Sequence, residues 1–153
     1  DMESKKMQVA ALRNGTVIDH IPSDKLFQVF NILDLGNCTN MITVGNNLNS
    51  DKIVKKGIIK ISDRFLEDNE ASKIALIAPN AKVNIIREFE VVEKRPLRLP
   101  EEVRDIVQCQ NPACITNHQP VHTWFHVMTE EDYTRLRCHY CEREVKLEDV
   151  RIR

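Results

Sequence analysis

Hydrophobic positions in residues 1–95 follow two periods, one typical of strands and one typical of helices. Short runs of β-branched and apolar residues predict strands at 15–21, 41–45, 57–62, 82–88 and 89–94. Two longer stretches, 22–35 and 67–79, repeat their apolar residues with the period of an amphipathic helix. In the first of these, Ser23 is the predicted N-cap. The predicted apolar face of that helix consists of Leu26, Phe27, Phe30 and Leu33.

The order strand, helix, strand, strand, helix, strand is the split βαβ pattern. It predicts an α+β fold with a ferredoxin-like antiparallel sheet and two helices on one face. The segment "EKRPLRLPEE" at 93–102 places Pro96 and Pro100 among charges, a composition typical of a linker. We therefore expect one domain over residues 1–95 and a second over 101–153.

The second predicted domain is short and rich in cysteine. In "VHTWFHVMT" at 121–129, Val121, Thr123 and Phe125 alternate with polar or amphipathic residues, which predicts a strand. A piece of about 53 residues buries too little surface to be stable by its core alone, so a metal ion is expected to supply folding free energy. We expect a small β domain of the zinc-ribbon kind.

Four of the five cysteines form two close pairs, Cys109 with Cys114 and Cys138 with Cys141. The chain has neither a long apolar segment nor the apolar core of a signal peptide near residue 1, which predicts a cytoplasmic, reducing location. Disulfides are rare there, and paired cysteines are more often zinc ligands. The spacing predicts one structural Zn²⁺ per chain held by four thiolates. Two short-loop disulfides are the alternative.

The sequence gives less support to the histidines as metal ligands and to Cys38 as a nucleophile. His118, His122 and His126 are spaced by four, which would align them on a helix, but the strand pattern instead predicts His122 and His126 on the solvent side. Cys38 is expected to be an inert thiol because no second cysteine or base lies near it in the sequence. An enzyme that uses Cys38 as a nucleophile is the alternative for this residue.

Charge and motifs narrow the function classes. The chain has 22 Lys and Arg and 23 Asp and Glu, so its charge is balanced. The alternative function is that of a zinc-ribbon nucleic-acid-binding protein, which needs a basic face to neutralise phosphates. The sequence holds no GxGxxG, GxxxxGK[ST], GxSxG or HExxH motif. Asp19 and His20 are neighbours in a predicted strand, so their side chains are expected on opposite faces. We expect no catalytic residues.

Several stretches together resemble a known family over nearly the whole chain. "QVAALRNGTVIDHIP", "KIALIAPNAKVNII", "EVVEK" and the cysteine spacing, in this order, resemble the regulatory chains of aspartate carbamoyltransferase. The resemblance implies a non-catalytic subunit with an N-terminal allosteric domain and a C-terminal zinc domain that contacts the catalytic chain. It also implies cytidine and adenosine triphosphates (CTP and ATP) as opposing effectors of pyrimidine biosynthesis, with uridine triphosphate (UTP) and Mg²⁺ beside CTP. Regulatory chains of this family form dimers, and three dimers link two catalytic trimers.

The resemblance also implies roles for particular residues. Lys60 and Lys94 would meet triphosphate and ribose oxygens near His20, and Asp19 would accept from a base amino group or a sugar hydroxyl. The remaining implied nucleotide contacts are Lys6, Val9, Leu12, Asn84, Ile86 and Val91. In the second domain, Asn111 and Glu142 match positions that contact the catalytic chain. Two residues depart from the family pattern, Phe89 in place of a pocket tyrosine and Ala113 in place of a polar interface residue.

Overall fold

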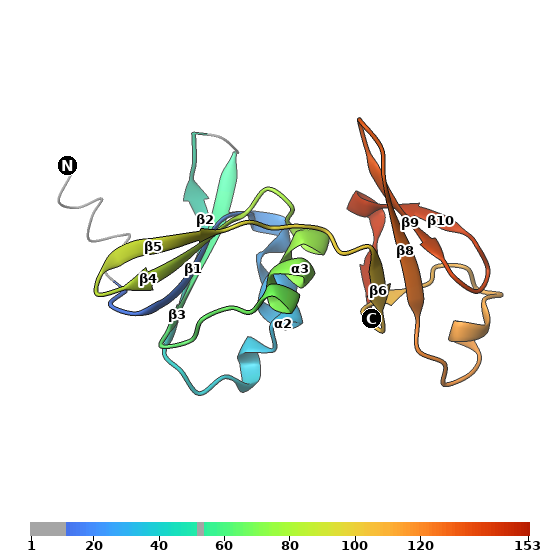
Figure 1. Ribbon diagram of the computed structural model, residues 1–153, viewed down its shortest axis with the longest axis horizontal. Coiled ribbons are helices and arrows are strands. Elements are labelled where there is room, and N and C mark those ends of the chain that lie inside the picture. The colour runs from blue at the N-terminus through green and yellow to red at the C-terminus, as the bar shows by residue number, and fades with distance from the viewer. Residues whose placement is uncertain (1–11, 52–53) are drawn as a thin grey trace. The chain divides into compact units, whose positions relative to one another are not determined.

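The computed structural model describes residues 12–51 and 54–153, which form two compact units divided between Arg98 and Leu99 (Figure 1). The first unit contains a five-stranded sheet and two α-helices. Its elements in chain order are β1 (Gly15–Pro22), α2 (Leu26–Ile32), β2 (Ile42–Asn49), β3 (Lys55–Ser62), α3 (Asp68–Ile77), β4 (Lys82–Arg87) and β5 (Glu90–Arg95). The predicted α+β class is confirmed.

Strand order explains the split βαβ pattern of the first unit. The sheet runs β2-β3-β1-β4-β5, and every neighbouring pair is antiparallel. Helix α2 connects β1 to β2 with β3 lying between these strands, and α3 connects β3 to β4 with β1 between them. β5 extends the sheet beyond the four-stranded ferredoxin-like core.

One face of this sheet is packed into the hydrophobic core. Residues that alternate along the three central strands are buried on this face, among them Ile18, Ile59, Ile61, Val83 and Ile85. Gly57 shows that α2 lies on the same face, since a Cβ atom there would come within 2.6 Å of Leu26 Cδ1. The opposite face carries the polar residues discussed below.

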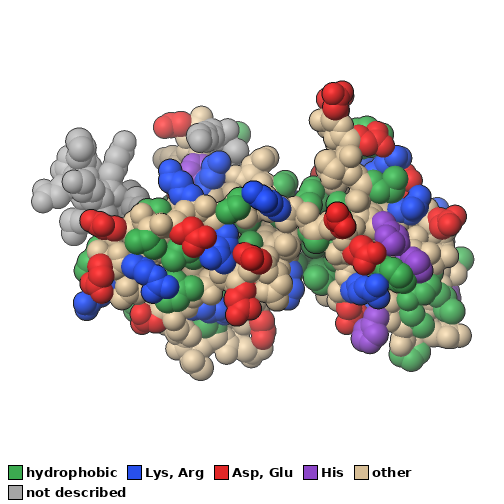
Figure 2. Space-filling view, viewed as in Figure 1, with side chains coloured by type: hydrophobic (Ala, Val, Ile, Leu, Met, Phe, Trp, Pro, Cys, Tyr) green, Lys and Arg blue, Asp and Glu red, His purple; other side chains and the backbone are tan. Residues whose placement is uncertain are grey.

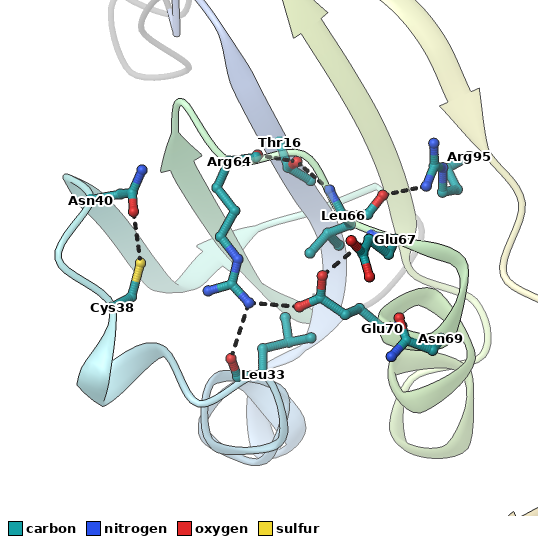
Figure 3. A network of polar contacts seen from close by, with 10 residues as sticks. All are labelled: Thr16, Leu33, Cys38, Asn40, Arg64, Leu66, Glu67, Asn69, Glu70 and Arg95. Atoms are coloured by element: carbon teal, nitrogen blue, oxygen red, sulfur yellow. Dashed lines mark hydrogen bonds and ion pairs between the residues drawn. The ribbon is translucent and has the colours of Figure 1, made fainter.

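A polar network connects the β3–α3 segment to β1 and α2 (Figure 3). The buried Thr16 hydroxyl donates to the Arg64 carbonyl at 2.7 Å and accepts from the Leu66 backbone N–H at 3.3 Å. Arg64 Nη2 donates to Glu70 Oε2 at 2.6 Å and to the Leu33 carbonyl at 3.4 Å. These bonds fix the start of α3 against the core face of the sheet.

The first helix differs from its prediction. A 3₁₀ helix at Ser23–Lys25 precedes α2, so Lys25 is the N-cap residue and Ser23 makes no capping hydrogen bond. Val29 is buried, while Phe27 is 64% exposed. The predicted Ser23 cap is therefore wrong. The buried residues of this segment are Leu26, Val29 and the C-cap Leu33, whereas Phe30 is half-buried.

The second helix and the remaining secondary structure agree more closely with the sequence patterns. Glu67 is the N-cap of α3 and forms a reciprocal capping box with Glu70. The helix ends before Pro79, with Ala78 as its C-cap. Within the part of the chain that the structure describes, no helix is long and apolar enough to cross a membrane.

The second unit is made of short antiparallel strands. A four-stranded sheet has the order β10-β9-β8-β6, and a second sheet pairs β11 with β7. The elements are β6 (Glu102–Arg104), β7 (Val107–Gln108), β8 (Trp124–Thr129), β9 (Thr134–Cys138), β10 (Glu144–Lys146) and β11 (Arg151–Ile152). Val103, Val107, Phe125 and Leu136 form its small buried core. The predicted small β domain is confirmed.

Candidate metal centre and polar sheet face

The four paired cysteines meet at one point of the second unit. Their Sγ atoms all lie within 4.8 Å of one another. Cys109 Sγ is 3.6 Å from Cys141 Sγ, and Cys114 Sγ is 3.8 Å from Cys138 Sγ. A tetrahedral zinc site with zinc–sulfur distances of about 2.3 Å has sulfur–sulfur edges of about 3.8 Å. The cysteines are free thiols, so the disulfide alternative is not supported.

Two turns bring the cysteines into this arrangement. In the first turn, Asn117 Nδ2 donates to the carbonyls of Cys109 and Asn111, at 2.9 and 2.8 Å, and the Cys114 N–H donates to the Asn111 carbonyl. In the second turn, the Glu142 N–H donates to the Cys138 carbonyl, with Glu142 in the left-handed region at φ 65°. Hydrogen bonds to backbone carbonyls therefore fix both cysteine pairs.

The electrostatics of this cluster favour a bound cation. Burial raises the pKa of the Cys109 and Cys138 thiols. Burial alone would also raise the pKa of Cys141, but hydrogen bonds from the Asn111 side chain and the Arg143 backbone lower it to about 7. Four adjacent thiolates would repel one another, and a divalent cation removes that repulsion. Four sulfur donors form a closed, soft ligand set, which suits structural zinc.

The histidines of this unit are not among the clustered ligands. The group of close metal-binding side chains found among the described residues contains the four cysteines alone. The His122 side chain is 83% exposed and pairs with Asp105, whereas His126 is half-buried on β8. Thr123 and Phe125 are buried between them, as a strand alternation requires. The alternation is therefore confirmed, although the strand itself begins only at Trp124.

An aromatic stack that sequence reasoning missed lies beside the cysteines. The Trp124 and His139 rings are stacked with centroids 3.4 Å apart, and Arg104 Cζ lies 3.9 Å from the Trp124 ring centroid. His126 Nε2 is 2.9 Å from His139 Nδ1. Because these residues come from β6, β8 and the turn after β9, no local sequence signal indicated their contact.

In the first unit, the proposed nucleotide residues fall on the sheet face opposite the core. Strand register aligns Lys60, Val17, Asn84 and Lys94 in one row across β3, β1, β4 and β5. Directly paired residues in antiparallel strands point to the same face. Ile86 and Val91 are also paired on this face, with Ile86 buried and Val91 51% exposed. The structure thus brings these residues together.

Asp19 and His20 follow in the same strand but break its alternation. A register shift between Ile18 and Ile21 and a positive φ of 58° at His20 turn the imidazole toward the carboxylate. His20 Nδ1 lies 3.6 Å from Asp19 Oδ2, and the His20 N–H donates to Asp19 Oδ1 at 2.7 Å. The prediction that the two side chains point to opposite faces is wrong, because the bulge reverses the local side-chain direction.

Two lysines of β3 approach Asp19 differently. Lys56 Nζ lies 2.9 Å from Asp19 Oδ1, an ion pair that sequence reasoning missed because pairing across strands is not a local signal. Lys60 is only 6% exposed. Burial lowers the pKa of Lys60, and the charge of Asp19 opposes this shift. A buried ammonium group of this kind favours an anionic ligand that restores its electrostatic stabilisation.

The other sequence-predicted positions are more scattered. Leu12 is half-buried, while Lys6 and Val9 lie outside the described residues. Phe89 is exposed in the β4–β5 turn, where Glu88 and Phe89 both have positive φ. Asn111 and Glu142 lie one in each cysteine turn, with Glu142 exposed. Cys38 is half-buried, and its Sγ lies 3.4 Å from Asn40 Oδ1.

Charges are mixed on both units. On the face in view in Figure 2, basic and acidic side chains are interspersed over each unit. The sequence totals are equally balanced, with a formal net charge of -1. A nucleic-acid-binding protein neutralises phosphates with a basic surface. The visible face gives that alternative function no support.

Comparisons with known proteins cover both units. A model of the family "aspartate carbamoyltransferase regulatory chain, allosteric domain" matches residues 7–98, and a model of its "metal binding domain" matches residues 101–151. An aspartate carbamoyltransferase regulatory chain of Phocaeicola vulgatus is 56% identical over 146 residues, covering 95% of this chain and 94% of the relative. The Bacteroides fragilis chain is also 56% identical, with 95% of both chains covered. The Pyrococcus abyssi chain is 46% identical over 147 residues, covering 95% and 96%.

Proposed function

Since the chain belongs to the family of aspartate carbamoyltransferase regulatory chains, we propose that it is the non-catalytic subunit through which nucleotides control a catalytic chain. The first unit binds CTP and ATP as opposing effectors of pyrimidine biosynthesis. UTP, with Mg²⁺, binds beside CTP. The second unit is the metal-binding domain and contacts the catalytic chain.

The row of polar side chains on the sheet face opposite the core carries the nucleotide proposal. Lys60 and Lys94 supply two ammonium groups in register with Asn84. Charge-assisted bonds from such groups to phosphate and ribose oxygens are among the stronger hydrogen bonds in proteins. Ile86 and Val91, paired on the same face, provide apolar contact for the base and sugar.

Asp19 supplies the one acceptor group that this proposal needs. Its carboxylate is held by Lys56 and by the His20 backbone N–H, which fixes its orientation. From there it accepts a hydrogen bond from a base amino group or a sugar hydroxyl, with His20 beside it. Lys6, Val9 and Leu12 complete the proposed site.

The second unit holds one structural Zn²⁺ per chain through Cys109, Cys114, Cys138 and Cys141. The ion supplies charge compensation and cross-links the two cysteine turns, and it takes no part in catalysis. Asn111 and Glu142, one in each turn, contact the catalytic chain. Because thiolates stay available as ligands only where they are kept reduced, we place the protein in the cytoplasm.

We propose that two chains pair through their first units and that three such dimers link two catalytic trimers. The decisive experiment is reconstitution with a purified catalytic chain, followed by size-exclusion chromatography and activity assays with each nucleotide. We expect a larger assembly whose activity responds to CTP and ATP in opposite directions. Absence of any complex, or a complex indifferent to all nucleotides, would overturn the proposal.

A further inference from the structure

The two cysteine turns of the second unit contact each other through their sulfur atoms. Cys109 Sγ lies against Cys141 Sγ at 3.6 Å, and Cys114 Sγ lies against Cys138 Sγ at 3.8 Å. Both contacts cross from one turn to the other. A disulfide formed along either contact would therefore join different turns, unlike a short-loop disulfide between Cys109 and Cys114.

The four cysteines differ in how closely a small molecule can approach them. Cys141 is half-buried, whereas the other three are buried. Cys109, although buried, lines a hollow of about 220 Å³ together with residues 143–145. Cys114 and Cys138 are 2% and 0% exposed, and neither lines this hollow. The two cysteines that a dissolved molecule can approach thus belong to the same cross-turn contact.

The other cross-turn contact is enclosed by the protein. Cys114 Sγ lies 3.2 Å from the hydroxyl of Thr116, which is itself buried, and Cys138 has no exposed surface. Oxidation of a cysteine depends on its exposure as well as on its thiolate character. We therefore expect Cys114 and Cys138 to stay reduced when the other two cysteines react.

We propose that Cys141 and Cys109 form an oxidative modification site, at which a hydroperoxide produces a disulfide between the two turns and thereby removes two ligands of the structural metal ion. This modification is separate from nucleotide control. Its consequence for assembly rests on the proposed function: a second unit that has lost its metal ion no longer presents the fold that contacts the catalytic chain. Oxidation of the free chain therefore prevents assembly.

The chemistry uses one hydroperoxide per disulfide. The Cys141 thiolate attacks the outer oxygen of the hydroperoxide, so that a sulfur–oxygen bond forms, the oxygen–oxygen bond breaks and an alkoxide leaves. The Cys109 thiolate then attacks the sulfur of the Cys141 sulfenic acid, which forms the disulfide and expels hydroxide. The two sulfur atoms together lose two electrons, the hydroperoxide is reduced to an alcohol and water, and two protons are taken up from solvent. Cys114 and Cys138 remain as thiolates, too few to close a zinc shell.

The test exposes the intact, zinc-loaded chain to hydrogen peroxide and follows zinc release with a chromogenic chelator. The remaining thiols are alkylated, and the chain is digested with trypsin without reduction. Trypsin separates the two turns because Arg135 and Arg137 lie between them, and it leaves both cysteines of each turn in one peptide. A cross-turn disulfide therefore links two peptides, whereas a short-loop disulfide links none.

We expect about one zinc ion released for each pair of linked peptides. Fragmentation should show Cys109 joined to Cys141, with Cys114 and Cys138 alkylated. Treatment with dithiothreitol should separate the peptides and restore zinc binding, because a disulfide is reversible. Cys38→Ser is the matched control: it removes a thiol of the first unit and should leave zinc release and the cross-link unchanged.

The possible failures are distinguishable. A disulfide within either turn, or zinc release that leaves all four cysteines open to alkylation, would overturn the inference. If the chain as purified holds no zinc but still forms the Cys109–Cys141 cross-link, the proposed zinc site fails and the modification site stands. If the cross-linked chain still assembles with a purified catalytic chain in size-exclusion chromatography, the consequence for assembly is wrong.

Discussion

Cys109 and Cys141 bring their sulfur atoms to 3.6 Å although the two residues are 32 positions apart in the chain. The contact joins the turn after β7 to the turn after β9. The buried apolar core of the second unit is small, and Val103, Val107, Phe125 and Leu136 are its members besides the cysteines. Bridging the turns through a metal ion would replace the burial that this unit lacks.

Metal removal should therefore unfold the second unit. Structural zinc in small domains contributes an apparent binding free energy of about 10–16 kcal/mol, far more than a core of this size supplies. We expect treatment with a mercurial to release one zinc per chain and to abolish the dispersed amide signals of residues 99–153 in NMR spectra. In the reconstituted assembly, the same treatment should release catalytic trimers and regulatory dimers. A second unit that stays folded without metal would contradict the structural role.

The identity of the ligands can be tested with single substitutions. Cys138→Ala removes one thiolate and should lower the zinc content after desalting from about one ion per chain to well below that, because three ligands leave the shell open. His126→Gln is the control, since His126 lies outside the cysteine cluster. Elemental analysis of both purified variants measures the result. Loss of zinc from the His126→Gln variant would mean that His126 also takes part in holding the ion.

Lys60→Met should stabilise the nucleotide-free first unit at neutral pH. Burial lowers the pKa of Lys60 from 10.5. The charged side chain therefore destabilises the folded state at any pH below the pKa that Lys60 has in the folded chain. As pH rises toward the unfolded value, the wild-type lysine deprotonates in the folded chain first and wild-type stability increases. The difference between the two proteins in urea unfolding should thus be largest at pH 7 and shrink by pH 10. A difference that grows with pH would show that the ammonium group is stabilising.

Lys94→Ala should weaken nucleotide binding. Loss of a charge-assisted hydrogen bond worth about 1.5–3 kcal/mol corresponds to roughly tenfold or more in affinity. The zinc content of the second unit should be unaffected. Calorimetry on the regulatory chain measures the affinity, and an unchanged value would mean that the proposed site is misplaced.

The connection between the units should carry the allosteric coupling. A nucleotide alters catalysis only if it binds two states of the assembly with different affinity, and coupling energies are typically about 1–3 kcal/mol. Replacing Pro96 and Pro100 by glycine loosens the segment between the units and should reduce that coupling.

Reciprocity makes this prediction measurable from both ends. A bisubstrate analogue bound to the catalytic trimers should change nucleotide affinity by the factor by which the nucleotide changes analogue affinity. If the wild-type assembly shows no coupling between nucleotide and analogue binding, the chain has only a structural linking role. Full coupling in the double glycine variant would reject only the role of the prolines.

Local periodicity was enough to predict the order of strands and helices in the first unit, because each pattern extends over a whole element. The two cysteine turns could also be predicted from the sequence, because the spacing within each pair of cysteines indicates a turn. The buried face of α2 was not predicted correctly, because Val29 is buried and Phe27 is exposed, and tertiary packing decides which residues are buried. Propensity and pattern are weak guides when tertiary packing selects the face.

The polar residues were predicted less completely for a related reason. The bulge at His20 needs a positive φ that histidine rarely adopts, so nothing in "VIDHI" indicated it. Lys82 shares a face with Asn84 by simple alternation, but that Pro96 and Leu97 line the same hollow as these two residues could not be predicted from the sequence. Contacts between distant strands follow from register, which sequence patterns alone left open.

Trp124 is the single tryptophan of the chain, and its ring is stacked on that of His139, the residue after Cys138. Tryptophan emission from the isolated chain therefore reports on one place, directly beside a proposed zinc ligand. Any rearrangement of the second cysteine turn changes the surroundings of the indole. Trp124 is thus an intrinsic fluorescence probe, and metal binding by the cysteine cluster can be followed without attaching a dye.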